Sequence, residues 1–315
     1  MSLYRMRTQV AVALEGTKGT AETLEAGDAI IMAEDVNPDY SPEQIERNVA
    51  YGDMSKTQST PGAPLASLSF RVEIKGSGTI DTAPAIGLLL QACGTLEGIT
   101  ASTSVAYTLD SDEDNRKSVT MGVLVDGSMW SMYGAQGNAV FSMDANQHCY
   151  INFNFVGIFE DFAPQALFSP TYETTKPAKW KNAAFTLNFG GGAWTSAVLD
   201  SFSLDLGNEV SVRPNANATN GLEYARIGDH RVTGTMNLDQ VLPATQDMFS
   251  HLETPTLASL SCVLGSDAGN ILTLTAPKLQ VLGLPSGDRE GLAIWNMPFA
   301  LRRNAGDDEL VITFT

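Results

Sequence analysis

The sequence predicts a mainly β protein made of two tandem β-sandwich or barrel-like domains, each with a flanking short α-helix and a long loop. Three observations predict this class. Charged residues make up 17% of the 315-residue chain and 28 residues are glycine, which favours strands and turns over a helix bundle. Apolar and polar residues alternate with a period of two along much of the chain. The order of elements in the first half returns in the second half.

The first half begins with residues 1–27, which show no sustained period and are predicted to form an N-terminal arm. Residues 68–75 then alternate without a break, which predicts a half-buried strand whose core face carries Leu68, Phe70, Val72 and Ile74. Residues 119–125 and 129–132 predict a hairpin through Asp126-Gly127, and residues 140–143 and 150–155 predict a second hairpin.

Residues 85–93 form the clearest helix of the sequence, with Thr82 as a cap, Pro84 at its start and Gly94 at its end. Phe153 and Phe155 alternate with asparagines in the strand 150–155. We interpret them as core residues rather than as a platform for stacking bases, because no Lys or Arg accompanies them.

The second half repeats this order. A strand region from 204 to about 213 is followed by a loop at 214–230, as residues 44–47 are followed by a loop at 48–66. The strand 232–239 and a short helix after Pro243-Ala244 come next, and strands at 271–275, 279–282, 292–301 and 310–314 complete the half. We therefore predict an arm at 1–27, a first β domain at 28–163, a linker at 164–181 and a second β domain of the same fold at 182–315.

The composition excludes several classes of function. The net charge of −17 argues against a protein that grips nucleic acid, since such proteins display clusters of Lys and Arg. No helical zinc pair of histidines, nucleophile elbow or phosphate-binding loop occurs. No catalytic, cofactor-binding or metal residue is therefore predicted, and we do not expect an enzyme.

Two smaller features have an ordinary interpretation. The acidic run at 110–115 lacks the Gly and the bidentate Glu of a calcium loop, so a solvated turn is favoured over a cation site. Cys93, Cys149 and Cys262 lie among apolar residues and are predicted to be buried thiols in a reducing compartment. No signal peptide or membrane span is predicted, so the chain is expected to be made in a cytoplasm.

Taken in order, these segments resemble the major tail tube protein of long-tailed bacteriophages. The resemblance rests on Gly76 to Thr79 and the helix at 82–94 in the first half, and on residues 202–210 and 305–310 in the second. It covers nearly the whole chain, from about residue 15, although each motif is short.

The resemblance implies a structural virion protein whose rings stack into a tube that conducts DNA during ejection. Many relatives have one domain and form hexamers, so two domains predict trimeric, pseudo-hexameric rings. The implied partners are other copies of the chain, a tape measure protein, and tail terminator and distal tail proteins. DNA is expected to pass without specific binding, no membrane partner and no cofactor are expected, and assembly is expected in the host cytoplasm. The alternative is a monomeric β-sandwich binding module, such as an adhesin or a carbohydrate binder.

Two sets of residues are candidates for this role. The polar faces of the alternating strands are predicted to face the lumen, through Ser69, Glu73, Thr233, Thr235, Asn237 and Asp239. In the strand 68–75, Arg71 and Lys75 alternate in the same phase as Ser69 and Glu73, which would place them on the same face. Their positive charge leaves that placement in doubt. The loop at 48–66 is predicted to dock on the next ring through Tyr51, Met54, Pro61 and Pro64.

Overall fold

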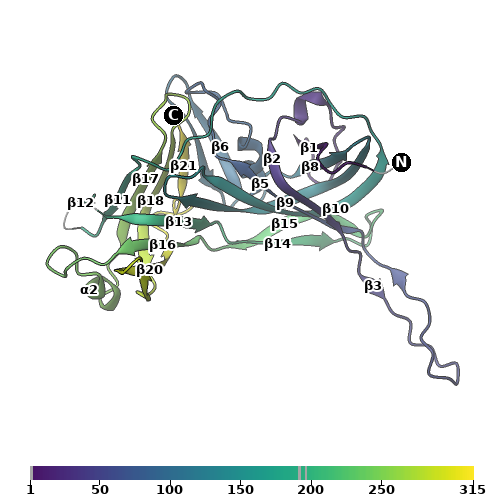
Figure 1. Ribbon diagram of the computed structural model, residues 1–315. Helices are drawn as coiled ribbons and strands as arrows, with labels where there is room; N and C mark the ends of the chain where they lie inside the picture. Colours follow the sequence, from purple (N-terminus) through teal and green to yellow (C-terminus); the bar gives the residue numbers. More distant parts are fainter. Residues whose placement is uncertain (1–2, 191–192, 196) are drawn as a thin grey trace.

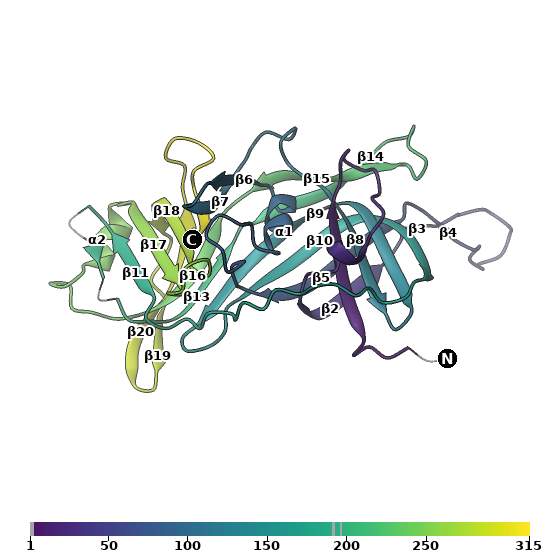
Figure 2. The same ribbon diagram turned by 90° about the horizontal axis from the view of Figure 1, so that it is seen from above.

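The computed structural model describes residues 3–190, 193–195 and 197–315 of the chain. Figures 1 and 2 show a mainly β molecule in which two short α-helices, α1 (Gly87–Ala92) and α2 (Met248–Glu253), flank the sheets. A one-turn helix η1 (Ala26–Asp28) lies near the N-terminus. The mainly β fold class is thus confirmed.

One path of eight antiparallel strands runs through both halves of the chain. Its order is β2 (Ala33–Tyr40), β5 (Leu65–Glu73), β10 (Tyr150–Pro164), β9 (Ser128–Asp144), β13 (Leu199–Asp205), β16 (Thr233–Asp239), β20 (Leu292–Leu301) and β19 (Ser286–Arg289). The central junction pairs β9 with β13, and so joins the two predicted domains in one sheet. We call these strands the eight-stranded path.

The remaining strands form outer layers. β1 (Thr8–Leu14) pairs with β8 (Val119–Val125), which pairs with β9. β12 (Ala193–Trp194), β11 (Ala184–Asn188), β17 (Ala258–Leu264) and β18 (Leu272–Val281) form the corresponding row in the second half. The last strand, β21 (Val311–Phe314), pairs with β18 and also with β7 (Ser104–Leu109), whose other neighbour is β6 (Thr95–Thr100). A strand of the first half, β7, is therefore paired with the last strand of the second half, β21.

The pairing scheme of the two halves corresponds strand by strand. β1–β8–β9–β10–β5–β2 in the first half matches β11–β17–β18–β20–β16–β13 in the second. The register also repeats, because the pairs Asn37↔Ser69 and Asp39↔Ser67 have counterparts in Ser203↔Thr235 and Asp205↔Thr233, each number 166 higher. This correspondence supports a duplication, although the bounds of the two domains stay a prediction.

Each half inserts a two-stranded excursion of similar length at the same point. In the second half, β14 (Asn208–Pro214) and β15 (Leu222–His230) form a ribbon between β13 and β16, and it packs along β9 and β10 of the first half. In the first half, β3 (Gln44–Ile45) and β4 (Thr60–Pro61) belong to an arm, residues 41–64, that extends away from the body (Figures 1 and 2).

A continuous apolar core lies behind the eight-stranded path. Phe70, Phe153 and Phe155 stack on one another in the first half, with ring centroids 5.7 to 6.0 Å apart. Phe202 and Phe299 stack at 5.8 Å in the second half. The prediction that Phe153 and Phe155 belong to the core is confirmed, since both are buried.

Several predicted elements need correction. The predicted arm at 1–27 contains β1, because Val10, Ala11 and Val12 are buried against β8. The predicted loop at 214–230 contains β15, which finds its partner in β14. Helix α1 begins at Gly87 without a side-chain cap, so Thr82 is not its cap, whereas Gly94 does end it with φ +84°. The Asp126-Gly127 hairpin is confirmed, and both of its turn residues have positive φ.

Candidate functional site

The feature that stands out is the polar face of the eight-stranded path. Residues directly opposite one another in antiparallel strands point to the same side of a sheet, so the register defines the membership of this face. One row runs Arg71, Asn152, Val140, Asp205, Thr233 and Ala300, and the next runs Glu73, Tyr150, Ser142, Ser203, Thr235 and Pro298. The opposite side carries the buried residues of the core.

All six predicted lumen residues lie on this single face. Ser69 and Glu73 alternate with buried residues on β5. Thr233, Thr235, Asn237 and Asp239 lie opposite Ala300, Pro298, Asn296 and Ile294 of β20. The structure therefore brings together residues that are far apart in the sequence, while their exposure to a channel stays a prediction.

The charges on these strands are strongly unequal. The eight strands, all of them described, contain eleven acidic residues and two basic ones, Arg71 and Arg289. Arg71 lies 3.0 Å from both Glu34 and Asp35 and stacks over the ring of Tyr150 at 4.7 Å. Arg289 binds Asp239 and donates to Oδ1 of Asn237 at 3.3 Å. Each positive charge on the face is thus neutralised by an acidic neighbour. Arg71 therefore lies on the polar face without leaving an unpaired positive charge there.

Lys75 belongs elsewhere. It lies beyond the end of β5 and is 5% exposed, with Nζ 3.4 Å from the carbonyl oxygen of Glu173 in the linker. Burial raises the pKa of the Glu173 carboxyl, and the backbone N–H of Ala85 and the charge of Lys75 oppose that rise. Alternation would place Lys75 on the polar face. That placement is wrong, because β5 ends at Glu73 and the next residues turn inward.

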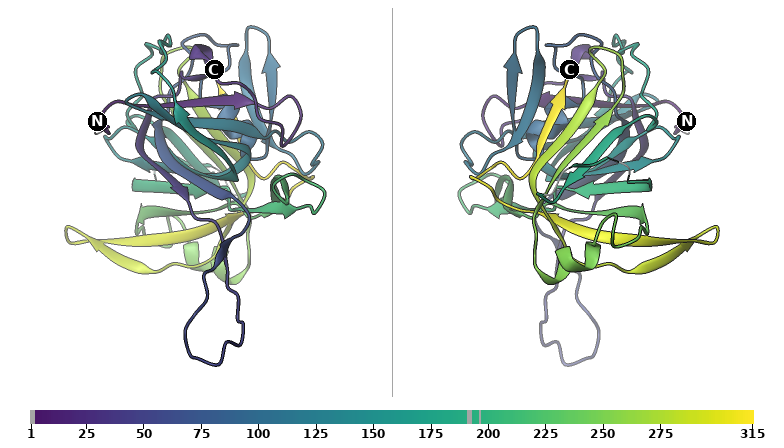
Figure 3. Two further views of the ribbon diagram at one scale, coloured as in Figure 1. Left: turned by 90° about the vertical axis from the view of Figure 1, so that its right-hand side faces the viewer. Right: turned by 90° about the vertical axis from the view of Figure 1, so that its left-hand side faces the viewer.

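The arm at residues 41–64 presents apolar side chains to solvent. Met54 is fully exposed and Tyr51 is 64% exposed. Some side-chain hydrogen bonds of the arm join its two sides, as Ser59 to Gln44 and Thr57 to the carbonyl of Arg47. Pro61 is exposed in β4, whereas Pro64 lies at the root, where its carbonyl accepts from the N–H of Phe159 at 2.8 Å. Figure 3 shows the arm projecting well clear of the sheets.

The ribbon shows how such an excursion binds when it has a partner surface. Asn208 donates to the carbonyls of Cys93 and Gly137 at 2.7 and 3.0 Å, and Ile227 N–H donates to Oε1 of Gln136 at 3.0 Å. Leu222, Ala225 and Ile227 are buried by this contact. The predicted strand region from 204 to about 213 covers β14, whereas β15 lies in the predicted loop. Asn208 beside Gly207, whose φ is +64°, was the available signal that β13 and β14 are separate strands.

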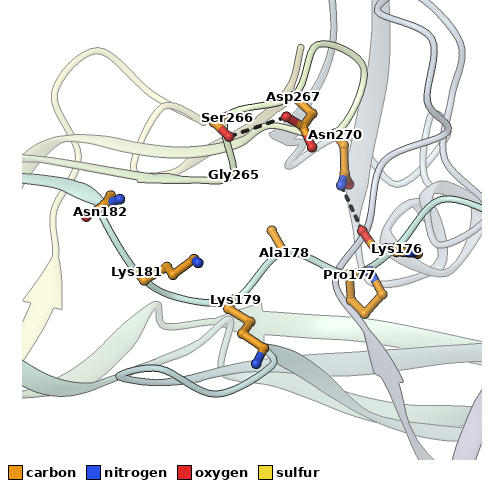
Figure 4. Close-up of a pocket in the computed structure, with 10 residues that line it drawn as sticks. All are labelled: Lys176, Pro177, Ala178, Lys179, Lys181, Asn182, Gly265, Ser266, Asp267 and Asn270. Carbon is orange, nitrogen blue, oxygen red and sulfur yellow. Dashed lines mark hydrogen bonds between the residues drawn. The ribbon is translucent and has the colours of Figure 1, made fainter.

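A hollow of about 240 Å³ marks the place where the linker meets the second half (Figure 4). Asn270 holds this junction together. Its Nδ2 donates to the carbonyl of Lys176 at 2.9 Å, and its Oδ1 accepts from the N–H of Gly76 at 2.8 Å. One side chain thus ties together the linker and both halves of the chain.

The described residues carry little that would support chemistry. They contain no group of three or more His, Cys, Asp or Glu side chains placed to hold a metal ion. The acidic run at 110–115 forms backbone-capping turns, with Asp110 accepting from the N–H of Asp112 at 2.7 Å. Cys93, Cys149 and Cys262 are buried as predicted, and burial raises the pKa of each thiol. None of the described helices has the length and apolarity needed to cross a membrane.

Comparison with known proteins gives one result for nearly the whole chain. The model of a family described as "Phage tail tube protein" matches residues 7–308. A comparison with curated proteins finds no match.

Proposed function

Because the chain belongs to the phage tail tube protein family, which makes it a structural component of a phage tail, we propose that its copies form rings that stack into the tail tube. The tube is then the conduit for DNA ejection. The observation that carries this proposal is the eight-stranded path, one face of which is polar while the other is the core. Tube assembly takes place in the host cytoplasm, and the tape measure, tail terminator and distal tail proteins are the further partners.

The duplication sets the ring size that we propose. Each half contributes four strands in the same order, β2-β5-β10-β9 and β13-β16-β20-β19. The end of β18 and β19 both pair with β20, so β18 and β19 together correspond to the single long strand β9. Three chains then supply six similar quartets, so a trimer has the pseudo-hexameric symmetry of a ring of single-domain subunits. Closing the sheets around a ring also removes their edges, which are otherwise prone to unwanted pairing.

The charge of the polar face suits a bore that does not hold DNA. A protein whose Lys and Arg side chains neutralise six to ten phosphates loses about 10³–10⁵-fold of its affinity for DNA between low and moderate salt. This loss shows how strongly such cations hold DNA. The register places Glu34, Asp39, Glu73, Asp144, Asp205 and Asp239 on the polar face. Both arginines of these strands are neutralised, so the face lacks free cations that would hold phosphates. Ser69, Glu73, Thr233, Thr235, Asn237 and Asp239 are the proposed lumen residues.

The test is to introduce cations into the bore. Glu73→Lys, alone and with Asp239→Lys, should leave assembly possible but impair DNA delivery. The single variant matters because Asp239 also binds Arg289. Glu253→Lys makes the same charge change on an exposed residue of α2 and should deliver normally. Tubes of the lysine variants that deliver DNA as well as this control would refute the proposed bore.

We further propose that the arm docks on the next ring through Tyr51, Met54 and Pro61, with Pro64 fixing its root. The support is a long excursion that exposes apolar residues and projects clear of the sheets (Figure 3). Deletion of residues 52–62 should leave folded protein that fails to polymerise, as seen by circular dichroism and negative-stain microscopy. Normal tubes from this deletion would show that the arm does not hold the rings together.

A further inference from the structure

We propose that the outer edge of β2 in one copy pairs with the outer edge of β19 in a second copy, in the register of the internal junction β9–β13. This seam rests on the proposed ring function and identifies its contact residue by residue. We also propose that Pro38 removes one hydrogen bond from the seam, which keeps separate copies from joining too readily.

The two strands are the ends of the eight-stranded path. Among the described residues, β2 pairs within the sheet with β5 and β19 pairs with β20, so each leaves one edge of backbone groups without a strand partner. An exposed edge is a template for another strand. Figure 2 shows β2 and the β19–β20 hairpin well apart, so a single chain does not close the path on itself.

The molecule contains a template for this contact. β13 corresponds to β2 by the constant difference of 166, and β13 pairs with β9 through Ser201↔Asp144, Ser203↔Ser142 and Asp205↔Val140. β9 pairs with β10, the next strand along the chain. In the second half the end of β18 and the whole of β19 pair in the same way with β20. The stretch from the end of β18 through β19 therefore corresponds to β9.

The equivalent residues follow from the partners on β10 and β20. Tyr150, Asn152 and Asn154 lie opposite Glu73, Arg71 and Ser69, as Ile294, Asn296 and Pro298 lie opposite Asp239, Asn237 and Thr235. Ser142 pairs with Tyr150 and Gly287 pairs with Ile294, while Pro285 accepts from Asn296 N–H. The seam therefore places Asn37 opposite Gly287 and Asp39 opposite Pro285 of the second copy.

Charge supports the same register. The residue that corresponds to Ser201 is Asp35, and the residue at the end of β19 that corresponds to Asp144 is Arg289. Asp35 binds Arg71 and is 73% exposed in the single chain, and Arg289 binds Asp239, so in the seam the two ion pairs of neighbouring copies lie against each other with Asp35 opposite Arg289. Opposite charges across an antiparallel pair favour that pairing over a slipped one.

Pro38 occupies the position of Leu204. At the internal junction Leu206 N–H donates to the carbonyl of Ala139 at 3.1 Å, and Ala145 N–H donates to that of Asp200 at 2.8 Å. Alternate residues of a strand direct their N–H groups to the same side, so Leu204 also directs its N–H to β9. Proline has no N–H, and the seam consequently lacks the bond that the internal junction has at this position.

Disulfide trapping tests the register. In assembled protein, Asp39→Cys with Pro285→Cys should give covalent multimers on oxidation, while Asp39→Cys with Asp288→Cys, three residues out of register, should not. The three native cysteines are buried. Oxidation of the unmodified chain measures how much crosslinking they cause on their own. Rings that form without the expected link, or that link the control pair instead, would overturn the seam and leave the ring function standing. Failure of the unmodified chain to form rings would overturn both.

Pro38→Leu tests the missing bond by restoring the residue type of the internal junction. It should lower the concentration for half-assembly about fivefold per seam, the equivalent of one net hydrogen bond of about 1 kcal/mol. Pro255→Leu adds the same side chain at an exposed position after α2 and should change nothing. An unchanged or raised assembly concentration for Pro38→Leu, with the Cys pair still linked, would refute the role of Pro38.

Discussion

The buried carboxylate of Glu15 gives the sharpest stability prediction, for the substitution Glu15→Gln. Its Oε2 accepts from Gly19 N–H at 2.8 Å and from the hydroxyl of Ser118 at 2.5 Å. Its Oε1 accepts from Gly134 N–H at 2.6 Å and from the hydroxyl of Thr120 at 3.0 Å. Gly134 has φ +59° and lies where the registers of β9 with β8 and with β10 shift, so this one side chain holds the irregular point, here called the bend, of a long strand.

An amide keeps one acceptor oxygen and turns the other position into a donor. The hydroxyl of Ser118 can rotate to accept from that donor, but the N–H of Gly19 cannot, so one charge-assisted bond is lost and a donor then faces a donor. Hydrogen bonds to charged groups contribute about 1.5–3 kcal/mol each, so the free energy of unfolding should fall by about 3 kcal/mol.

Urea denaturation followed by circular dichroism measures this loss. Glu22→Gln is the matched control, because the exposed Glu22 accepts one bond from Gly16 N–H at 3.0 Å and should lose less than about 1 kcal/mol. Equal midpoints and slopes for the two variants would refute the claim that the Glu15 carboxylate organises the bend.

Three further predictions concern other parts of the molecule. Asn270→Ala should lower the free energy of unfolding by about 2 kcal/mol in the same denaturation assay, because it leaves the N–H of Gly76 and the carbonyl of Lys176 without their partner; a loss below about 0.5 kcal/mol would contradict this. Gly207→Ala should reduce the yield of folded protein in solubility and melting assays, since an added Cβ would lie 2.2 Å from the carbonyl oxygen of Arg231. Burial raises the pKa of Cys149 and of Cys262 to about 12, so at pH 8 both stay thiols and should react with iodoacetamide only on unfolding; rapid labelling of the native protein, detected by mass spectrometry, would count against that.

Local patterns in the sequence predicted the pieces of this fold better than their assembly. The alternation at 68–75 and 232–239 led to β5 and β16, and Asp126-Gly127 led to the hairpin of β8 and β9. These signals are local, since a period of two or a turn dipeptide depends on adjacent residues. β15 was missed because Leu222, Ala225 and Ile227 do not alternate strictly, and their burial depends on a surface of the first half.

The candidate site shows the same division. Parity placed the six predicted lumen residues on one face of their own strands, and the register confirms that shared face. Alternation within one strand could not predict the pairing of β9 with β13, which joins the polar faces of the two halves. It also could not predict the acidic partners of Arg71 and Arg289. These depend on contacts between distant segments, which no short window of sequence contains.

The pairing of β7 with β21 has a consequence for synthesis of the chain. Residues 104–109 leave the ribosome long before residues 311–314, so the β6–β7 hairpin lacks the strand beside it while the intervening residues are made. The first half of a nascent chain is therefore an incomplete fold even when its own core has formed. Its outer layer closes only when residues 311–314 have been made, which delays the appearance of an assembly-competent subunit until the second half is present as well.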